Sequence, residues 1–463
     1  MRDNRFGARR LAVCLLLLIL TLVFSGCFPA TRTGDGTDPA TDRGTTPATA
    51  FVELLSESDG IPAFNRTVLK RMHVYYTNFY VGELGTVEET VAAIVDLYHE
   101  YRNLIDETDP NEVTDLLCEC YLAAVGDKYA YYMNAEAYAE YDSDLTGNYV
   151  GIGVQVTNNS LERTITITAV FPNTPAFEAG LLTGDTIERV GDASIADLSF
   201  AEVVNRIRGE EGTDVTVTFG RNGETFTRTM TRRSVTQVTS SASMRPGTPK
   251  IGVVRITEFD DTTAPQFKTA LDGLLASGAE GLVFDLRNNP GGLLTSILSI
   301  LDYFVPDGTP LASYLYYDGE RETDYADDGH EIPASVPIAV LCNEYTASAG
   351  ELFTCAMQDY GKQGLLDVKV VGTVTYGKGT MQTLFFLSKG EADGGTDDMT
   401  RATTVSVAYY DPPYSGNYEG VGVIPDVSVD LSEEAKAKSV YVLTEEEDTQ
   451  MQAAIASVAE RIR

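Results

Sequence analysis

The chain has 463 residues, enough for two or three domains of roughly 150 residues each. Its hydrophobic content of 43% is ordinary for a globular protein. The formal net charge of −34 argues against nucleic-acid binding, because neutralising phosphates requires clustered Lys and Arg. We interpret the acidity as a solvated surface.

The N-terminus predicts a secretory signal over residues 1–27. Four arginines precede the apolar segment Leu11–Phe24, which is too short to span a bilayer comfortably. The segment ends in FSGC, which resembles a bacterial lipoprotein signal, in which the cysteine is lipidated. The resemblance implies a lipid anchor on Cys27 and a position on the outer, extracytoplasmic face of the bacterial cytoplasmic membrane. Simple secretion with cleavage nearby is the alternative.

A flexible linker is expected over residues 28–60, whose first part is rich in Thr, Pro, Gly and Asp and poor in large apolar residues. A helical region is predicted over residues 61–145. Thr86–Arg102 and Asp109–Ala124 have helical periodicity with acidic first turns, and Phe64–Gly82 adds a third candidate helix. Helices near both ends are candidates for pairing in a homodimer.

The cysteines predict no metal site. Cys118 and Cys120 are too close together for a metal-binding knuckle, so buried thiols are expected. A disulfide between Cys342 and Cys355 stays open, since an extracytoplasmic compartment permits it.

Residues 146–235 carry a second pattern. Strand candidates at Tyr149–Val156 and Thr164–Phe171 precede PAFEAGLLTGDTIERVGD and a helix at Leu198–Gly209. The segment resembles a PDZ domain of the bacterial, permuted kind. The resemblance implies a groove in which a peptide C-terminus adds as a strand and backbone N–H groups hold its carboxylate. The candidate groove residues are Gly151, Ile152, Gly153 and Val154, where glycine permits close backbone approach.

Residues 236–440 alternate strand and helix patterns, which predicts an α/β core, and a C-terminal helix is expected over 441–463. NEYTASAGE, with Ser348, lies between an apolar strand and a helix, where we expect an exposed serine. A serine nucleophile needs a base. The chain has only three histidines, His73, His99 and His330, which lie far upstream or in a loop. A lysine can serve if it is neutral, a form that burial favours.

DLRNNPGG, ASAGE and GKGTMQ, in this order, resemble the carboxyl-terminal processing peptidases, or tail-specific proteases. The resemblance covers roughly residues 86–430. It implies a catalytic dyad of Ser348 and Lys378, supported by Gln382, and Glu351 matches an acidic position of the same motif. It also implies a multidomain fold of α+β and α/β parts: an N-terminal helical region, a PDZ domain and a protease core.

A developing oxyanion needs two N–H donors. We expect one to be the amide of Ala349, at the start of a helix whose dipole also helps. The other should come from Gly291 or Gly292, because the PGG sequence allows close backbone approach.

The sequence therefore predicts a secreted serine endopeptidase that binds protein C-termini and cleaves extended or unfolded tails through an acyl-enzyme. No cofactor is implied. The competing hypothesis is a binding module, a PDZ scaffold whose protease core is inactive.

Overall fold

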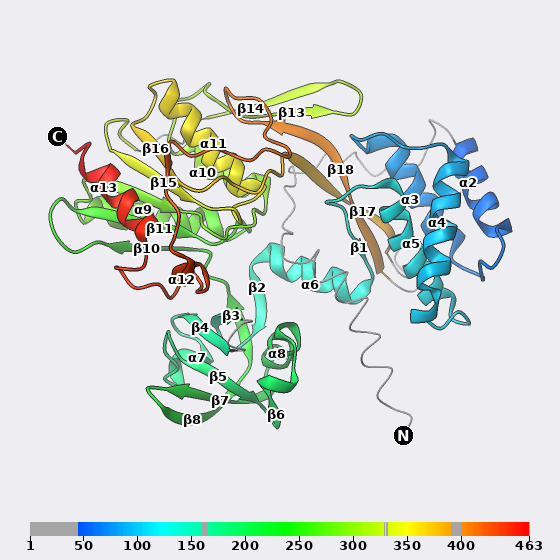
Figure 1. Cartoon of the computed structure of the whole chain (residues 1–463), viewed down its shortest axis with the longest axis horizontal. Helices are drawn as coiled ribbons and strands as arrows, with labels where there is room; N and C mark the ends of the chain where they lie inside the picture. Colours follow the sequence, from blue (N-terminus) through cyan, green and yellow to red (C-terminus); the bar gives the residue numbers. More distant parts are fainter. Residues whose placement is uncertain (1–44, 160–163, 328, 330–331, 390–399, 463) are drawn as a thin grey trace.

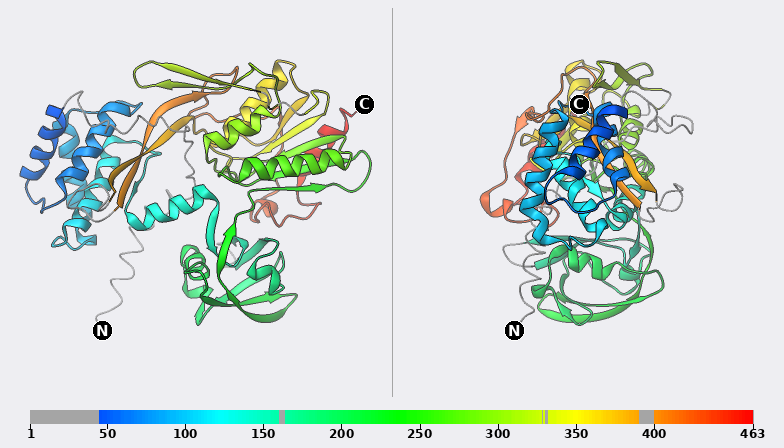
Figure 2. Two further views of the ribbon diagram at one scale, coloured as in Figure 1. Left: turned by 180° about the vertical axis from the view of Figure 1, so that it is seen from behind. Right: turned by 90° about the vertical axis from the view of Figure 1, so that its right-hand side faces the viewer.

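The computed structural model describes residues 45–159, 164–327, 329, 332–389 and 400–462. Figure 1 shows three parts: a group of helices at one end, a mixed sheet-and-helix core at the other, and a small β-rich domain below them. A long pair of strands runs from the core to the helices, and the view from behind shows the same arrangement (Figure 2).

The N-terminal helices begin earlier than expected. Residues 45–60 are part of the predicted linker, yet α2 is a helix in which Phe51 and Leu55 are fully buried against the next helices. Two apolar side chains one turn apart offset the ordering cost that the Thr-rich flank led us to expect. The other helices end close to their predicted limits. The elements are α2 (Thr45–Glu57), α3 (Arg66–Phe79), α4 (Val87–Tyr101), η1 (Arg102–Leu104), α5 (Pro110–Val125), β1 (Tyr132–Met133) and α6 (Ala135–Thr146).

Capping explains where these helices start and stop. Thr86 and Glu89 form a reciprocal capping box at the start of α4. Asp109 caps α5 ahead of Pro110, and Gly126 ends that helix in the left-handed conformation, with φ of 72°. This sharp stop turns the chain toward the core and places the next residue, Asp127, in a buried position.

The small domain has its own apolar core, separate from the rest. One strand had been expected over residues 149–156, but the chain leaves the strand conformation at Ile152 and Gly153, and Gly153 has φ of +81°. The break divides the run into two strands of different sheets. The elements are β2 (Asn148–Gly151), β3 (Val154–Asn159), β4 (Thr164–Val170), α7 (Pro175–Glu178), β5 (Thr186–Val190), β6 (Ala193–Ser194), η2 (Ile195–Asp197), α8 (Phe200–Ile207), β7 (Asp214–Arg221), β8 (Glu224–Thr231) and β9 (Arg233–Thr236).

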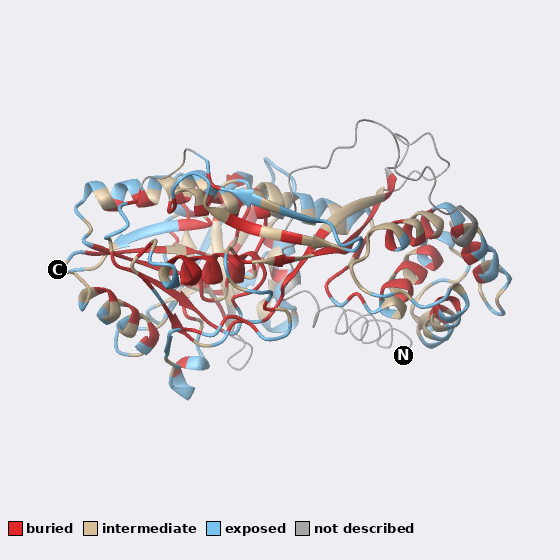
Figure 3. Cartoon of the chain, turned by 90° about the horizontal axis from the view of Figure 1, so that it is seen from above, coloured by how far each residue is buried: buried red, intermediate tan, exposed pale blue. Residues whose placement is uncertain are grey.

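The core contains a six-stranded sheet in the order β10-β11-β12-β15-β16-β19, parallel except at β10. Helices α9, α10 and α11 pack on one face and α13 on the other. Because both faces are covered, β12 and β15 are buried at every position. Figure 3 shows buried segments inside the molecule and exposed ones around them. The elements are β10 (Ser240–Met244), β11 (Ile251–Ile256), α9 (Thr263–Ala276), β12 (Gly281–Asp285), α10 (Leu294–Asp302), β15 (Ile338–Cys342), α11 (Ala349–Lys362), β16 (Val368–Gly372), β19 (Val427–Ser428), α12 (Glu433–Lys436) and α13 (Thr449–Ala459).

A second sheet, which the sequence did not predict, joins the core to the N-terminal helices. β18 pairs with β1, β13 and β17, and β13 pairs with β14. Tyr75 of α3 stacks on Phe385 of β17, with ring centroids 4.6 Å apart, and the buried Arg401 of β18 binds Asp115 of α5. One apolar cluster therefore runs from the helices through to the core. The strands are β13 (Pro310–Tyr316), β14 (Arg321–Tyr325), β17 (Thr380–Lys389) and β18 (Thr400–Asp411).

The four cysteines of the described residues are buried and free. The disulfide between Cys342 and Cys355, left open above, is therefore not formed. Burial raises the pKa of the Cys355 thiol to about 12, so it stays protonated at neutral pH.

Candidate active site

Ser348 sits at the turn between β15 and α11, as the residue just before the helix. Its φ of 53° and ψ of −119° are unusual for a residue with a side chain, and such strain typically costs about 1–3 kcal/mol. The expected exposure is wrong, because Ser348 is fully buried. Tyr410 and Tyr418 cover it: the Tyr410 hydroxyl lies 3.5 Å from Ser348 Oγ, and the Tyr418 hydroxyl donates to Ser348 O at 3.3 Å.

Glu351 joins the serine turn to the lysine segment. Its buried carboxylate accepts four hydrogen bonds, two on each oxygen. Oε2 accepts from Ser348 N at 2.9 Å and from Lys378 N at 2.8 Å. Oε1 accepts from the Thr375 hydroxyl and from Gly377 N, both at 2.6 Å. Burial raises the pKa of Glu351, and the four donors oppose that shift. One carboxylate thus fixes two distant segments side by side.

Lys378 is almost fully buried, with 1% of its surface exposed. Its Nζ lies 5.2 Å from the centre of the Tyr129 ring, and its carbonyl accepts from the Tyr410 hydroxyl at 2.8 Å. The flanking glycines permit this packing, as expected. A Cβ on Gly377 would lie 3.1 Å from Gly422 N, and one on Gly379 would lie 2.4 Å from Asn417 Oδ1. Tyr410 therefore contacts both Ser348 and Lys378.

Gln382 is buried on β17, four residues after Lys378. Its Nε2 donates to the Thr380 hydroxyl at 2.9 Å and to Ser406 Oγ at 3.1 Å. Its Oε1 is buried and accepts no hydrogen bond from any described residue. A buried carbonyl oxygen without a donor is costly, and such groups need an explanation.

The predicted oxyanion donors lie beside the serine. Gly291 is so close that a Cβ there would lie 2.7 Å from Ser348 Cβ and 2.9 Å from Ala349 N. Gly291 N itself donates to Asn289 Oδ1 at 2.8 Å. Within the described chain, the amides of Gly292 and Ala349 have no hydrogen-bond partner. Of the two glycines, only Gly292 therefore has an amide without an acceptor among the described residues.

The predicted groove residues border the edge of the small sheet. β3, which begins at Val154, is an edge strand paired only with β4 among the described elements. Ile152 is buried, and its carbonyl accepts from Ala176 N at 2.8 Å, while the carbonyl of Gly153 accepts from Phe171 N. The amides of Ile152 and Gly153 donate to no other described residue. Ile152 and Val154 pack in one cluster with Val203 of α8.

The histidines lie away from the serine or outside the described residues. His73 is buried: Phe51 stacks on it, and its Nδ1 contacts the Tyr121 hydroxyl at 3.0 Å. His99 is exposed and contacts Asp59 O. His330 and Cys27 lie outside the described residues.

No group of three or more His, Cys, Asp or Glu side chains in the described residues could hold a metal ion. No helix in the same ranges is both long and apolar enough to cross a bilayer.

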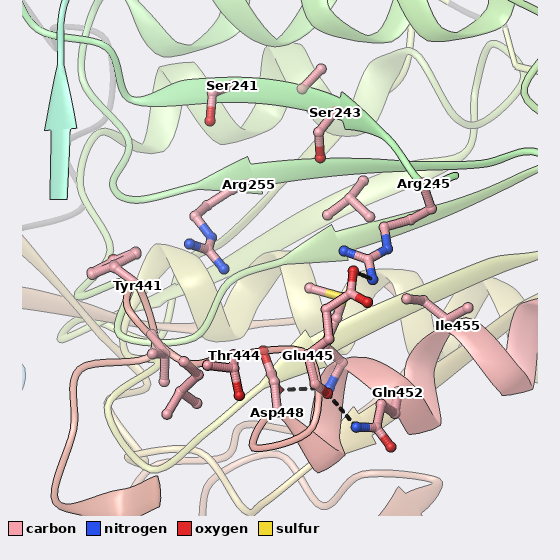
Figure 4. A pocket seen from close by; sticks show the side chains of 15 residues that line it. Ser241, Ser243, Arg245, Arg255, Tyr441, Thr444, Glu445, Asp448, Gln452 and Ile455 are labelled. Atoms are coloured by element: carbon pink, nitrogen blue, oxygen red, sulfur yellow. Dashed lines mark hydrogen bonds and ion pairs between the residues drawn. The ribbon is translucent and has the colours of Figure 1, made fainter. Parts of the chain in front are cut away.

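A cavity of about 290 Å³ lies elsewhere, between β10, β11 and the segment before α13 (Figure 4). Its arginines are paired within the protein: Arg245 with Glu445, and Arg255 with Asp285 at 2.7 Å. Neither Ser348 nor Lys378 lines it, so it is separate from the serine site.

Sequence reasoning missed four residues around the site: Tyr129, Tyr410, Asp127 and Ser406. They come from α5's C-terminal turn and from β18, which no motif marked. The only signal was that residues 119–141 lie within the family resemblance over roughly residues 86–430, which assigns no role to any one residue.

Comparison with known proteins agrees with this architecture. The family model of peptidase family S41 matches residues 250–429, and that of the PDZ domain matches residues 150–230. The carboxy-terminal processing protease CtpA of Bacillus subtilis is 30% identical over 332 residues, covering 71% of this chain and 66% of that protein. A Staphylococcus saprophyticus protein described as a probable CtpA-like serine protease is 27% identical over 348 residues, covering 75% of this chain and 66% of its own length.

The matches thus span just under two thirds of the length of these relatives. Among solved structures, that of an S41-type protein from Bacteroides fragilis has a TM-score of 0.53 at 17% identity, covering 82% of this chain and 98% of that one. This likeness supports the fold alone. Residues 250–429 thus match the model of peptidase family S41, residues 150–230 ahead of them match that of the PDZ domain, and the chain is similar to a carboxy-terminal processing protease at 30% identity.

Proposed function

We propose that the protein is a serine endopeptidase that processes the C-terminal tails of proteins with Ser348 as nucleophile and Lys378 as base. The observation that carries the proposal is the Glu351 carboxylate, which holds the backbones of Ser348 and Lys378 together in a buried site. The match of residues 250–429 to peptidase family S41 and the similarity to a carboxy-terminal processing protease support the same reaction class.

In the proposed reaction, Ser348 Oγ attacks the scissile carbonyl carbon while neutral Lys378 Nζ takes its proton. The carbonyl oxygen gains negative charge and accepts from the amides of Ala349 and Gly292. Collapse breaks the C–N bond, and Lys378 returns the proton to the leaving amine. Water then attacks the acyl-enzyme with Lys378 again as base, and the products are a new carboxylate and free Ser348.

The buried environment suits a lysine base. An exposed lysine is almost entirely protonated at neutral pH, whereas removal from water disfavours the charged form. Lys378 is 1% exposed, and its Nζ lies 5.2 Å from the centre of the Tyr129 ring. Tyr410 contacts both reacting residues and limits the approach of water.

The PDZ domain is proposed to select the substrate. A peptide C-terminus would pair with the free edge of β3, beside α8, with its carboxylate near the amides of Ile152 and Gly153. Apolar Ile152 and Val154 favour an apolar last residue on the substrate. Extended or unfolded tails fit, because strand addition requires an extended peptide.

The test is cleavage of an unfolded protein such as reduced casein by the wild type and by Ser348→Ala. We expect fragments with new C-termini from the wild type and none from the variant, as read by mass spectrometry. If both variant and wild type bind the substrate without cutting it, the protein is a binding module with an inactive core.

We also propose that the mature protein is lipid-anchored through Cys27 outside the cytoplasmic membrane. The FSGC sequence after an apolar segment supports this. Wild-type protein from a bacterial host should partition into detergent, whereas Cys27→Ala should remain in the aqueous phase. A mature N-terminus at another residue, found by peptide sequencing, would disprove the anchor.

A further inference from the structure

Asp127 and Ser406 form a buried polar pair behind the lysine segment. Asp127 follows the C-terminal turn of α5 and is 6% exposed, and Ser406 on β18 is 2% exposed. The Asp127 carboxylate accepts from Ser406 Oγ at 2.7 Å through Oδ1, and from Ser406 N at 3.0 Å through Oδ2. The hydroxyl of Tyr76 also donates to Oδ2, at 3.3 Å.

These contacts determine to which neighbour the Ser406 hydroxyl donates its hydrogen. A serine hydroxyl has a single hydrogen, and Ser406 gives it to the carboxylate. The Ser406 oxygen can therefore only accept from its other neighbour, which is Gln382, 3.1 Å away. The group of Gln382 that faces Ser406 must be the NH₂ rather than the carbonyl, which settles an orientation that amide geometry alone leaves open.

The second hydrogen of Gln382 Nε2 goes to the Thr380 hydroxyl at 2.9 Å. Both amide hydrogens are then used, and Oε1 points away from Ser406 without a protein donor among the described residues. Gln382 is in register with Ser406 across the β17–β18 pair, so the contact does not depend on a flexible loop. The amide is held in one of its two possible orientations.

The same turn that supplies Asp127 also touches the lysine. The Tyr129 ring faces Lys378 Nζ at 5.2 Å. Its hydroxyl lies 2.9 Å from Glu419 Oε1 and 3.3 Å from Gly377 O.

Lys378 lies two residues before β17, which begins at Thr380, and Gln382 is the third residue of that strand. The buried Oε1 of Gln382 accepts from no described residue, Lys378 included, so it is the acceptor that the amide orientation leaves available near the lysine segment.

We propose that Asp127 is a positioning residue that acts through Ser406, orienting the Gln382 amide so that its carbonyl oxygen is presented to Lys378. An oxygen there accepts a hydrogen of the lysine amine and turns the nitrogen lone pair toward Ser348. An NH₂ group there would instead donate to that lone pair and occupy it. This inference rests on the proposed function. It adds Asp127 and Ser406, which lie outside the family motifs, to the residues that support catalysis.

Asp127→Asn tests the idea, because it changes the direction of the proton chain at almost constant shape. The Tyr76 hydroxyl lies equally close to Asp127 Oδ2 and to Thr404 O, and the backbone N–H of Tyr129 also donates to the Asp127 carboxylate. The backbone N–H of Ser406 requires an oxygen at the position of Oδ2. The new NH₂ therefore takes the place of Oδ1 and donates to Ser406, whose hydroxyl must now donate to Gln382. The amide turns over and presents NH₂ to Lys378.

We expect kcat of Asp127→Asn to fall by about tenfold or more, because the general base is no longer correctly aligned. KM should change little. The acidic limb of its pH–rate profile should move to lower pH, because a donor facing the amine favours the neutral form. Ser406→Ala should lower kcat in the same way, and Ser406→Thr, which keeps the hydroxyl, should restore it. In a Gln382→Ala background, Asp127→Asn should have little further effect.

The matched control is Asp359→Asn. Asp359 is another buried carboxylate that accepts the backbone N–H and hydroxyl of one serine, Ser415, but it has no contact with Gln382. The Asp359→Asn variant should be less stable in urea than the wild type, but its pH–rate profile should not shift. If the wild type cleaves but Asp127→Asn keeps its kcat and profile, or loses activity equally in the Gln382→Ala background, the inference is wrong and the proposed function stands. A wild type that cleaves nothing overturns both.

Discussion

The carboxylate of Glu351 accepts a hydrogen bond from the backbone N–H of Lys378 at 2.8 Å, across 27 residues of sequence. The same oxygen accepts from Ser348 N, so the proposed nucleophile and base are positioned by a group that takes part in neither bond-making nor proton transfer. The relative placement of the two residues thus depends on one buried negative charge.

Glu351→Gln should therefore lower both stability and activity. A glutamine places NH₂ where one oxygen now accepts from two donors, so at least one backbone N–H is left without an acceptor. We expect a loss of about 3 kcal/mol in the free energy of unfolding, the upper range for a buried unsatisfied donor. Urea denaturation and casein cleavage measure the two effects.

The control is Glu344→Gln, in the turn between β15 and α11. Glu344 is exposed and accepts from the Thr373 hydroxyl at 3.0 Å. It should change the free energy of unfolding by less than about 0.5 kcal/mol. Equal effects of the two changes would contradict the role given to Glu351.

Lys378→Arg should be inactive although it keeps the positive charge. A guanidinium does not lose its proton in proteins, so it cannot take one from Ser348. We expect kcat to fall by about 10³-fold, within the usual range for a general base. Lys362→Arg is the control, since Lys362 lies at the end of α11, where it donates to Gln358.

Replacement of all three histidines should leave most activity, and a folded but inactive triple variant would refute the lysine base.

His73 should make the protein sensitive to acid. Burial lowers its pKa from 6.5 to about 4, so the native state holds the neutral ring while the unfolded chain binds a proton. The stability is fully present above pH 6.5 and is lost progressively as the pH falls toward 4. The difference corresponds to about 3 kcal/mol at most.

His73→Phe should flatten this dependence, measured as the free energy of unfolding between pH 7 and pH 4. The lost contact with the Tyr121 hydroxyl lowers stability by about 1 kcal/mol at every pH. The exposed His99 serves as the comparison, and His99→Gln should leave the slope unchanged. A steep acid loss that persists in His73→Phe would assign the effect to other groups.

Substrate choice should depend on a free carboxylate. Amidating the C-terminus of a good peptide substrate removes the charge that the amides of Ile152 and Gly153 would bind, so KM should rise by about tenfold. A substrate ending in Asp should also be cut less well than one ending in Leu. Equal kcat/KM for all three peptides would show that the PDZ domain does not select by the C-terminus.

Local patterns predicted the individual elements well. The alternation and turn residues of the small domain and the capped helices α4 and α5 lie within a few residues of the predicted ranges, because their signals are short-range. The placement of Ser348 beside Lys378 followed from the family resemblance. The burial of Ser348 did not follow, since it depends on Tyr410 and Tyr418, whose distance along the chain hides their contact.

The second sheet was missed for the same reason. β17 and β18 pair with each other, and β17 packs against α3. None of these contacts leaves a local sequence pattern. Asp127 and Ser406 lie 279 residues apart, and only their burial together gives them a shared role. Helix α2 was missed because Thr-rich and Pro-containing sequence favours a linker, whereas tertiary burial of Phe51 and Leu55 overrode that preference.

The two chain segments that connect the PDZ domain to the rest of the molecule lie side by side. β2 and β9 pair from Asn148 with Thr236 to Gly151 with Arg233, and Gln237 N donates to Gly147 O at 2.7 Å. The two ends of the inserted segment are therefore neighbours, while the apolar cluster that spans residues 51 to 423 excludes it. The parts of the chain before and after the PDZ domain therefore share one apolar cluster, although the domain separates them in sequence. A short loop from Gly147 to Gln237 could replace the inserted domain without removing a strand from either large sheet of the rest.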